Sequence, residues 1–188
     1  MRKKKVKNAP GNMQLEFIRL DKIDRCLMAA LLEDGRMPLS EIAQRARAAP
    51  ATIHERLAKL RRIGIIKGFS ARLNARALGY TVTALVHLRT NLAKNVGQTV
   101  SELQAIPEVE EIHVITGEYD LWVKVRARDT AHLQELLIKR IHRVTGFVRS
   151  ATEICLTTPL ERSAPAFQSA ESFPDDVIVG SNLSENTT

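Results

Sequence analysis

The segment Thr116 to Asp120, TGEYD, has the composition of a tight hairpin turn and carries two carboxylates, Glu118 and Asp120. The chain around it is basic, with a formal net charge of +7 over 188 residues. Two carboxylates in one short turn need a positive partner. That partner is either a neighbouring Lys or Arg side chain or the cationic group of a bound ligand. The composition of the turn leaves both possibilities open.

A second group of chemically active side chains lies in residues 50–64, PATIHERLAKLRRIG. Ile53, Leu57 and Leu60 recur at helical spacing and predict one buried face. The rest of this helix mixes residue types that hydrogen-bond base edges with cations that neutralise phosphates. The first type is represented by Thr52, His54 and Glu55, and the second by Arg56, Lys59, Arg61 and Arg62. This mixture favours DNA as the partner of the helix.

Two further helices precede this one and would position it. The segment LDKIDRCLMAALLEDGR, residues 20–36, has apolar residues at helical spacing, with Asp21 as N-cap and Gly35 as stop. A short helix follows Pro38, and Pro50 opens the third. Three short helices with a brief turn between the last two predict a helix-turn-helix. A generic three-helix bundle is the alternative that periodicity alone does not exclude.

The pattern changes from about residue 80 onward. Strands are predicted at YTVTALVHLR, VEEIHVIT, LWVKVRA and FVRSATEICL, and helices at NVGQTVSELQAI and TAHLQELLIKRIHRV. The order βαββαβ predicts an α+β fold with a four-stranded antiparallel sheet and both helices on one of its faces. Something else must then cover the other face.

Charge and composition divide the chain further. Residues 1–64 contain 15 Lys and Arg against 7 Asp and Glu, a net charge of +8, so the surface for an anionic partner is expected there. The last 30 residues, from Pro159, carry a net charge of −4. We expect a flexible basic arm at 1–18, a helix-turn-helix domain at 19–66, a linker strand at 67–79, a sheet domain at 80–158 and a disordered acidic tail at 159–188.

Several classes of protein and site are not expected. The chain has no apolar run long enough for a membrane helix and no secretion signal at its start, which favours a cytoplasmic protein without a membrane partner. Cys26 and Cys155 lack CxxC spacing and are interpreted as buried thiols. No GxSxG, P-loop or HExxH motif is present. We therefore predict no enzyme activity, catalytic residue, metal or cofactor.

The order of several short motifs adds a family resemblance. These are LDKIDRCLMAALLEDGR, EIA, RLAKLRRIGIIKGFSARLN, LGY, TGEYDLWVKV and GFVRSATEICL, which together span residues 20–156. In this order they resemble the Lrp/AsnC (feast/famine) family of transcription regulators. The resemblance implies a winged or linker-joined helix-turn-helix followed by a ferredoxin-like effector domain. It also implies a homodimer that buries the open face of the sheet, with further assembly into forms such as octamers.

Three positions depart from the family pattern. Arg47 stands where the turn usually has Gly, Ala49 where the N-cap is usually Ser, and Pro38 where a polar residue usually opens the second helix. Ala in place of Ser at an N-cap costs roughly 0.5 to 2 kcal/mol. Pro50 at the first helical position compensates in part, and Arg47 is interpreted as an added phosphate contact.

The resemblance implies a regulator that binds specific double-stranded DNA and responds to a small effector, expected to be an amino acid. The DNA contacts are predicted at Arg47, Ala51, Thr52, His54, Glu55, Arg56, Lys59 and Arg62. The effector contacts are predicted at Thr116, Gly117, Glu118, Tyr119, Asp120, Ser150 and Thr152. Asp120 would accept from the ammonium of the ligand, and backbone N–H groups of the turn would bind its carboxylate.

Two alternatives stay open beside this prediction. Sirohaem decarboxylases resemble the same family in both domains, and His87 or His113 would then face a tetrapyrrole. An amino-acid-binding module without DNA binding is the other. The basic helix at residues 50–64 favours the DNA-binding prediction over both.

Overall fold

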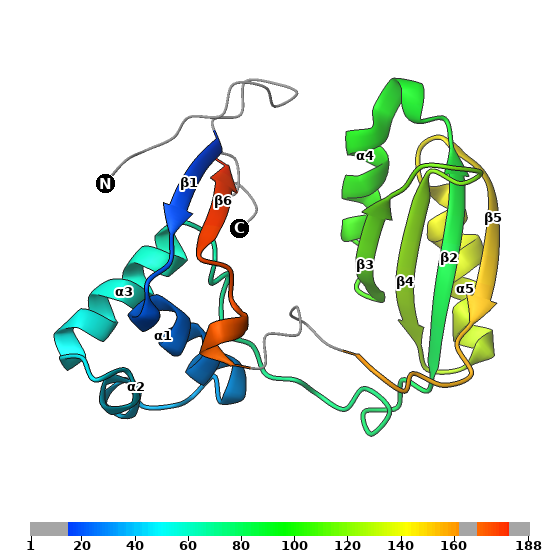
Figure 1. Ribbon diagram of the computed structural model, residues 1–188. Helices are drawn as coiled ribbons and strands as arrows, with labels where there is room; N and C mark the ends of the chain where they lie inside the picture. Colours follow the sequence, from blue (N-terminus) through cyan, green and yellow to red (C-terminus); the bar gives the residue numbers. More distant parts are fainter. Residues whose placement is uncertain (1–14, 162–168, 181–188) are drawn as a thin grey trace. The chain divides into compact units, whose positions relative to one another are not determined.

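The computed structural model describes residues 15–161 and 169–180. Their contacts form two compact units, each of which is described by itself (Figure 1). The helical unit holds the described residues up to Ala71 together with those from Ser169 onward. The sheet unit runs from Arg72 to Glu161.

Three helices form the helical unit: α1 (Lys22–Glu33), α2 (Leu39–Ala46) and α3 (Pro50–Arg62). Asp21 caps α1, since its carboxylate accepts from the backbone N–H groups of Ile23 and Asp24. Asp24 completes a capping box by accepting from the N–H of Asp21. The three helices share one core, built from Leu27, Met28, Ile42, Ala43, Ile53 and Leu60. The predicted helical spacing is therefore confirmed.

The helical unit also contains a two-stranded sheet that the sequence analysis did not predict. Strand β1 (Leu15–Arg19) pairs antiparallel with β6 (Asp176–Gly180), and a short 3-10 helix, η2 (Ala170–Ser172), precedes β6. The structure differs here from the expected flexible arm over residues 1–18 and disordered tail over 159–188, because residues 15–18 and 176–180 lie in paired strands. The other parts of these two predictions, residues 1–14, 162–168 and 181–188, lie outside the described residues. Each strand is short and pairs with a segment far away in the sequence, so neither is recognisable by itself.

The linker differs from its prediction as well. The structure has no strand over residues 67–79; it has an irregular segment that ends in a turn at residues 75–79. A strand needs a hydrogen-bonding neighbour, and none of the described residues pairs with this segment in a ladder. The first strand of the sheet unit is therefore the one that begins at Val82.

The sheet unit has the predicted βαββαβ order. Its elements are β2 (Val82–Thr90), α4 (Leu92–Gln104), β3 (Val109–Val114), β4 (Leu121–Ala127), α5 (Thr130–Lys139), the 3-10 helix η1 (Ile141–Arg143) and β5 (Phe147–Ile154). The strands lie in the order β3-β4-β2-β5, and every neighbouring pair is antiparallel. The predicted α+β fold with a ferredoxin-like sheet is confirmed.

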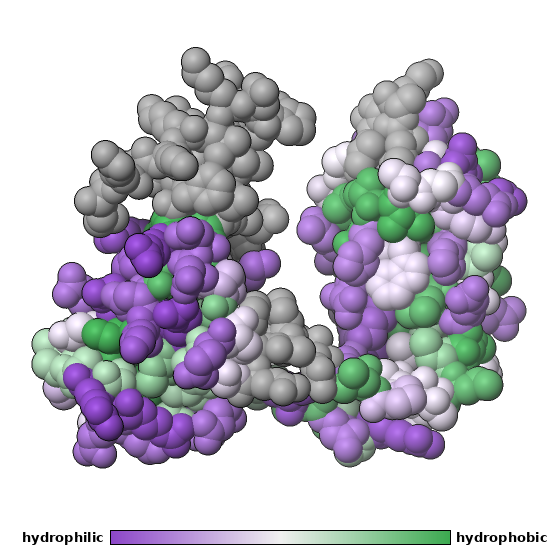
Figure 2. Space-filling model, viewed as in Figure 1, coloured by the Kyte–Doolittle hydropathy of each residue, from purple (hydrophilic) through white to green (hydrophobic). Residues whose placement is uncertain are grey.

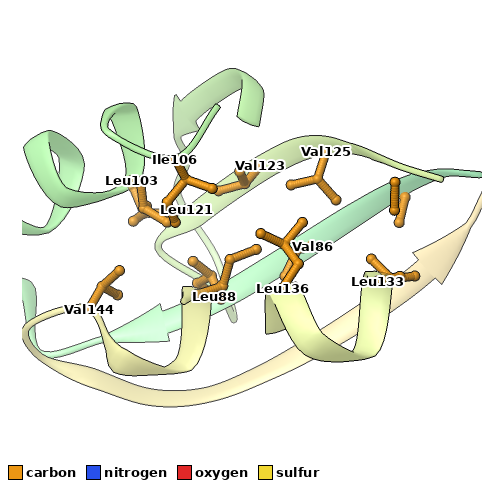
Figure 3. Close-up of a cluster of buried hydrophobic side chains, with 13 residues drawn as sticks. Val86, Leu88, Leu103, Ile106, Leu121, Val123, Val125, Leu133, Leu136 and Val144 are labelled. Atoms are coloured by element: carbon orange, nitrogen blue, oxygen red, sulfur yellow. The ribbon is translucent and has the colours of Figure 1, made fainter. Parts of the chain in front are cut away.

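The core of the sheet unit lies between the sheet and its two helices (Figure 3). Alternate residues of the central strands point into it, as the period of two in a strand requires. They are Ala84, Val86 and Leu88 of β2 and Leu121, Val123 and Val125 of β4, which meet Leu103 of α4 and Leu133 and Leu136 of α5. Leu85, His87 and Trp122, which lie between them, are only half-buried. They form the open face of the sheet.

Candidate functional site

The turn between α2 and α3 forms without the residues that usually favour it. Arg47 ends α2 in the left-handed region, with φ 50° and ψ 46°, a conformation that costs a non-glycine residue about 1 kcal/mol. Ala49 is the N-cap of α3 and has no side-chain oxygen to accept from the helix. Pro50 occupies the first turn of α3. The compact helix-turn-helix geometry is therefore kept at a cost in local stability.

The solvent-facing side of α3 presents most of the predicted base-reading residues. Ala51, His54 and Glu55 are exposed and Thr52 is half-buried, while Ile53 and Leu60 point into the core. These residues lie in the first half of the helix. That half reaches base edges when a recognition helix enters the major groove.

Two cations of α3 face the protein instead of the solvent. Arg56 and Lys59 meet Asp21 and Asp24 of the α1 N-terminus, and these four residues are called the Asp24 cluster. The Arg56 Nη1 lies 2.8 Å from the Asp21 carboxylate and 3.4 Å from that of Asp24. The Lys59 Nζ lies 3.2 Å from the Asp24 carboxylate, whose side chain is 0% exposed. Arg56 and Lys59 thus already have partners within the helical unit.

The charges of the Asp24 cluster reinforce the helix cap. Partial burial by itself would raise the pKa of the Asp21 carboxyl, but the hydrogen bond from the Asp24 backbone and the charge of Arg56 outweigh it. The pKa of Asp21 is therefore held below its usual value, and the cap carries its full negative charge near the helix N-terminus. From the sequence alone Arg56 and Lys59 are predicted phosphate contacts, because the pattern of residues 50–64 does not show that these two side chains face α1.

Other cations remain free around the recognition helix. Arg47, Arg61 and Arg62 are exposed, and the structure records no ion pair between them and another described residue. Arg47 lies just before α3 and the other two at its C-terminal end. Arg61 belongs with this group, although it is not among the predicted DNA contacts. These three guanidinium groups are the phosphate-binding candidates that the geometry supports best.

The hairpin loop, Thr116 to Asp120, joins β3 to β4 at one end of the sheet. Asp120 ties the loop to β2, because its Oδ2 accepts from the Thr90 backbone N–H at 2.8 Å. Its own N–H donates to the Leu88 carbonyl at 2.9 Å. Gly117 has φ 127°, in the region that favours glycine. The loop is therefore a defined structure with Asp120, 18% exposed, at its base.

Two arginines are the positive partners of the loop carboxylates. Arg89 of β2 donates to the Glu118 carbonyl at 3.0 Å, and its Nη1 lies 3.5 Å from the Asp120 carboxylate. Arg149 of β5 pairs with the Glu118 carboxylate at 2.7 Å and lies over the Tyr119 ring. The hydrogen bond to Glu118 raises the pKa of Arg149. Neither arginine is among the residues predicted from the sequence, although Arg89 lies two residues after His87 and therefore on the same open face.

The predicted effector residues are not all brought together. Tyr119 contacts His87, which belongs to the open face, with the ring centroids 5.5 Å apart. Ser150 and Thr152 pair in register with Leu88 and Val86, so they lie on the helix-covered side of the sheet. The Ser150 hydroxyl lies 2.9 Å from Nε2 of His142, a residue of η1. The loop and the two hydroxyl residues therefore occupy different sides of the sheet.

The described residues do not form a metal site or a membrane-spanning helix. Within residues 15–161 and 169–180, no group of three or more His, Cys, Asp or Glu residues is arranged to hold a metal ion. None of the described helices is both long and apolar enough to cross a membrane. Cys26 and Cys155 are free thiols, half-buried rather than fully buried as expected.

Both units match models of known protein families. Residues 20–61 match the family model of the AsnC-type helix-turn-helix domain. Residues 81–165 match that of the Lrp/AsnC ligand binding domain. The chain belongs to the Lrp/AsnC family of transcriptional regulators. Its helical unit is thus a DNA-binding module of this family, and its sheet unit is the family's ligand-binding domain.

Individual Lrp/AsnC relatives align over most of their own length. The HTH-type transcriptional regulator FL11 of Pyrococcus horikoshii is 36% identical over 144 residues, covering 77% of this chain and 94% of that protein. Regulatory protein AsnC of Escherichia coli is 30% identical over 149 residues, covering 79% and 98%. The similarity therefore extends across both units.

Solved structures of the Lrp/AsnC family share the fold. E. coli AsnC superimposes with a TM-score of 0.73 at 30% identity, covering 78% of this chain and 99% of AsnC. A feast or famine regulatory protein of M. tuberculosis complexed with L-methionine gives 0.71 at 32% identity, covering 77% and 97%.

Proposed function

We propose that this Lrp/AsnC regulator reads specific double-stranded DNA with α3 and that an amino-acid effector bound by the sheet unit controls this binding. The observation that carries the proposal is the composition of the exposed side of α3. His54 and Glu55 offer groups for base edges, and Arg47, Arg61 and Arg62 are free to meet phosphates. Because Arg56 and Lys59 pair with Asp21 and Asp24, we propose that these two cations position the helix rather than bind DNA.

The hairpin loop supports an amino acid as the effector. A free amino acid carries an ammonium and a carboxylate. The loop region offers carboxylates at Glu118 and Asp120 for the first, and guanidinium groups at Arg89 and Arg149 for the second. The L-methionine complex of the M. tuberculosis relative supports the same ligand class. An effector here would exchange some of these internal contacts for its own.

The open face of the sheet supports a homodimer. Figure 1 shows α5 behind the strands, so the same view in Figure 2 looks onto the open face, where hydrophobic and hydrophilic residues are mixed. Trp122 and Leu85 are only half-buried there, and a second copy of the chain would cover them. We infer a homodimer through this face and further assembly into a form such as an octamer.

The roles on α3 are testable by binding to a library of DNA sites. Replacing Glu55 with alanine should relax base preference at one position of each half-site, where a base contact contributes about 1 to 3 kcal/mol. Replacing Arg62 with alanine should weaken all sites alike and reduce the dependence of affinity on salt. Lys139→Ala is a matched control, because this exposed cation lies in the sheet unit and pairs with Glu135. Identical profiles for Glu55→Ala and Arg62→Ala would contradict the assignment.

A further inference from the structure

The described segment 169–180 lies outside both family matches, which end at residues 61 and 165. Residues 169–180, called the C-terminal strap, contain η2 and β6 and are part of the helical unit. The helical unit is thus made of two segments of the chain, one before and one after the sheet unit. Figure 1 shows β6 beside β1 next to the three helices. The question is therefore what residues 169–180 contribute to the helical unit.

The C-terminal strap is bound through its backbone, its core and its charge. All five residues of β6 pair with β1, from Leu15↔Gly180 to Arg19↔Asp176. The side chain of Phe173 is 7% exposed and belongs to the same core cluster as Leu27 and Ile53. A buried phenylalanine contributes more to such a core than any surface contact of the segment.

The contacts of the C-terminal strap converge on the start of α1. The Leu20 N–H donates to the Asp175 carbonyl at 2.7 Å, and the Asp175 carboxylate pairs with Arg25. Leu20 immediately precedes Asp21, the N-cap of α1. Arg25 follows Asp24, which holds Arg56 and Lys59 of α3. A continuous series of contacts therefore runs from the strap through the first turn of α1 to the recognition helix.

We propose that the C-terminal strap is a positioning element of the DNA-binding module, anchored by Phe173, which fixes the first turn of α1 and through the Asp24 cluster the placement of α3. This inference rests on the proposed role of α3 in reading DNA. The strap adds to the helix-turn-helix a part that neither family match contains. Without Phe173, α3 would still carry its DNA-contacting side chains, but its orientation toward the base edges would no longer be fixed.

The test compares Phe173→Ala, Phe173→Leu and wild type in the full chain, each measured well below its unfolding midpoint. For Phe173→Ala, affinity for a selected specific site should fall about tenfold, the equivalent of one lost base contact. Affinity for random DNA and its salt dependence should stay unchanged, since the free arginines are retained. Phe173→Leu should restore most of the specific affinity. Leu160→Ala, a control at a residue that is 65% exposed in the sheet unit, should behave as wild type.

Three results would overturn the proposal. If Phe173→Ala keeps the wild-type ratio of specific to random affinity, the strap only stabilises the fold. If Phe173→Ala does not fold, the milder Val177→Ala, at a half-buried position of β6, must lower the same ratio, and an unchanged ratio there overturns the inference. If wild type itself does not distinguish specific from random DNA, the proposed function fails first, and the inference falls with it.

Discussion

Replacing Asp24 with asparagine should lower the free energy of unfolding of the helical unit by about 3 kcal/mol. The Asp24 side chain is 0% exposed and lies beside Arg56 and Lys59, which are themselves 28% and 25% exposed. Asparagine keeps the size and an acceptor for the Asp21 N–H, but it leaves two largely buried cations with only Asp21 as counter-charge. Removing one partner of a buried ion cluster costs far more than the cluster contributes as a whole.

The measurement is native-state hydrogen exchange at the amides of Leu27 and Ile53, which reports the opening of the helical unit alone. Glu33→Gln is the matched control, because Glu33 pairs with Arg45 at 2.7 Å but is 64% exposed. An exposed pair of this kind contributes about 0 to 1 kcal/mol. Equal losses in the two variants would show that the Asp24 cluster behaves as a surface ion pair.

Replacing Asp120 with asparagine should weaken binding of the amino-acid effector about tenfold or more. Charge-assisted hydrogen bonds contribute roughly 1.5 to 3 kcal/mol, and the variant removes the charge that would face the ligand ammonium. Asparagine suits this test because its side-chain oxygen can still accept from the Thr90 N–H, the bond that holds the hairpin loop. DNA affinity without effector should change little, since α3 belongs to the other unit.

Calorimetric titration of the free amino acids into wild type and Asp120→Asn measures this difference. Glu118→Gln provides a comparison at an exposed carboxylate of the same loop, which already pairs with Arg149, and it should have a smaller effect. An effector controls DNA binding only through its differential affinity for two states of the protein. A ligand that binds wild type and Asp120→Asn equally would remove Asp120 from the site.

The helices and the sheet order were predictable because their signals are local. Apolar spacing in residues 20–36 and 50–64, the cap at Asp21 and the alternation in β2 each report on a few neighbouring residues. The Asp24 cluster was not predictable in this way. A lysine or arginine on a helix looks the same in the sequence whether it meets a phosphate or a carboxylate of another helix.

The C-terminal strap and the arginine partners of the hairpin loop were not predictable, because they depend on contacts between residues that are distant in the sequence. Arg25 and Asp175 are separated by 150 positions, and β6 has no partner near it in the sequence. Arg149 reaches Glu118 only because β5 and β4 flank β2 in the sheet. Ser150 and Thr152 lie on the helix-covered side of the sheet, whereas Tyr119 contacts the open face. This placement likewise follows from the register of β5 against β2, and a one-residue shift of register would reverse it.

A genome-wide footprint of the purified protein on fragmented DNA tests whether the chain is a dimeric, sequence-specific regulator. If two copies of α3 enter successive major grooves, the protected sites should be imperfect palindromes with half-sites about one helical turn, roughly 34 to 36 Å, apart. Protection should decline steeply as salt is raised, because several arginines meet phosphates. Protection without sequence preference would show that the chain is not a sequence-specific regulator, and protection of single half-sites only would show that it does not bind DNA as a dimer.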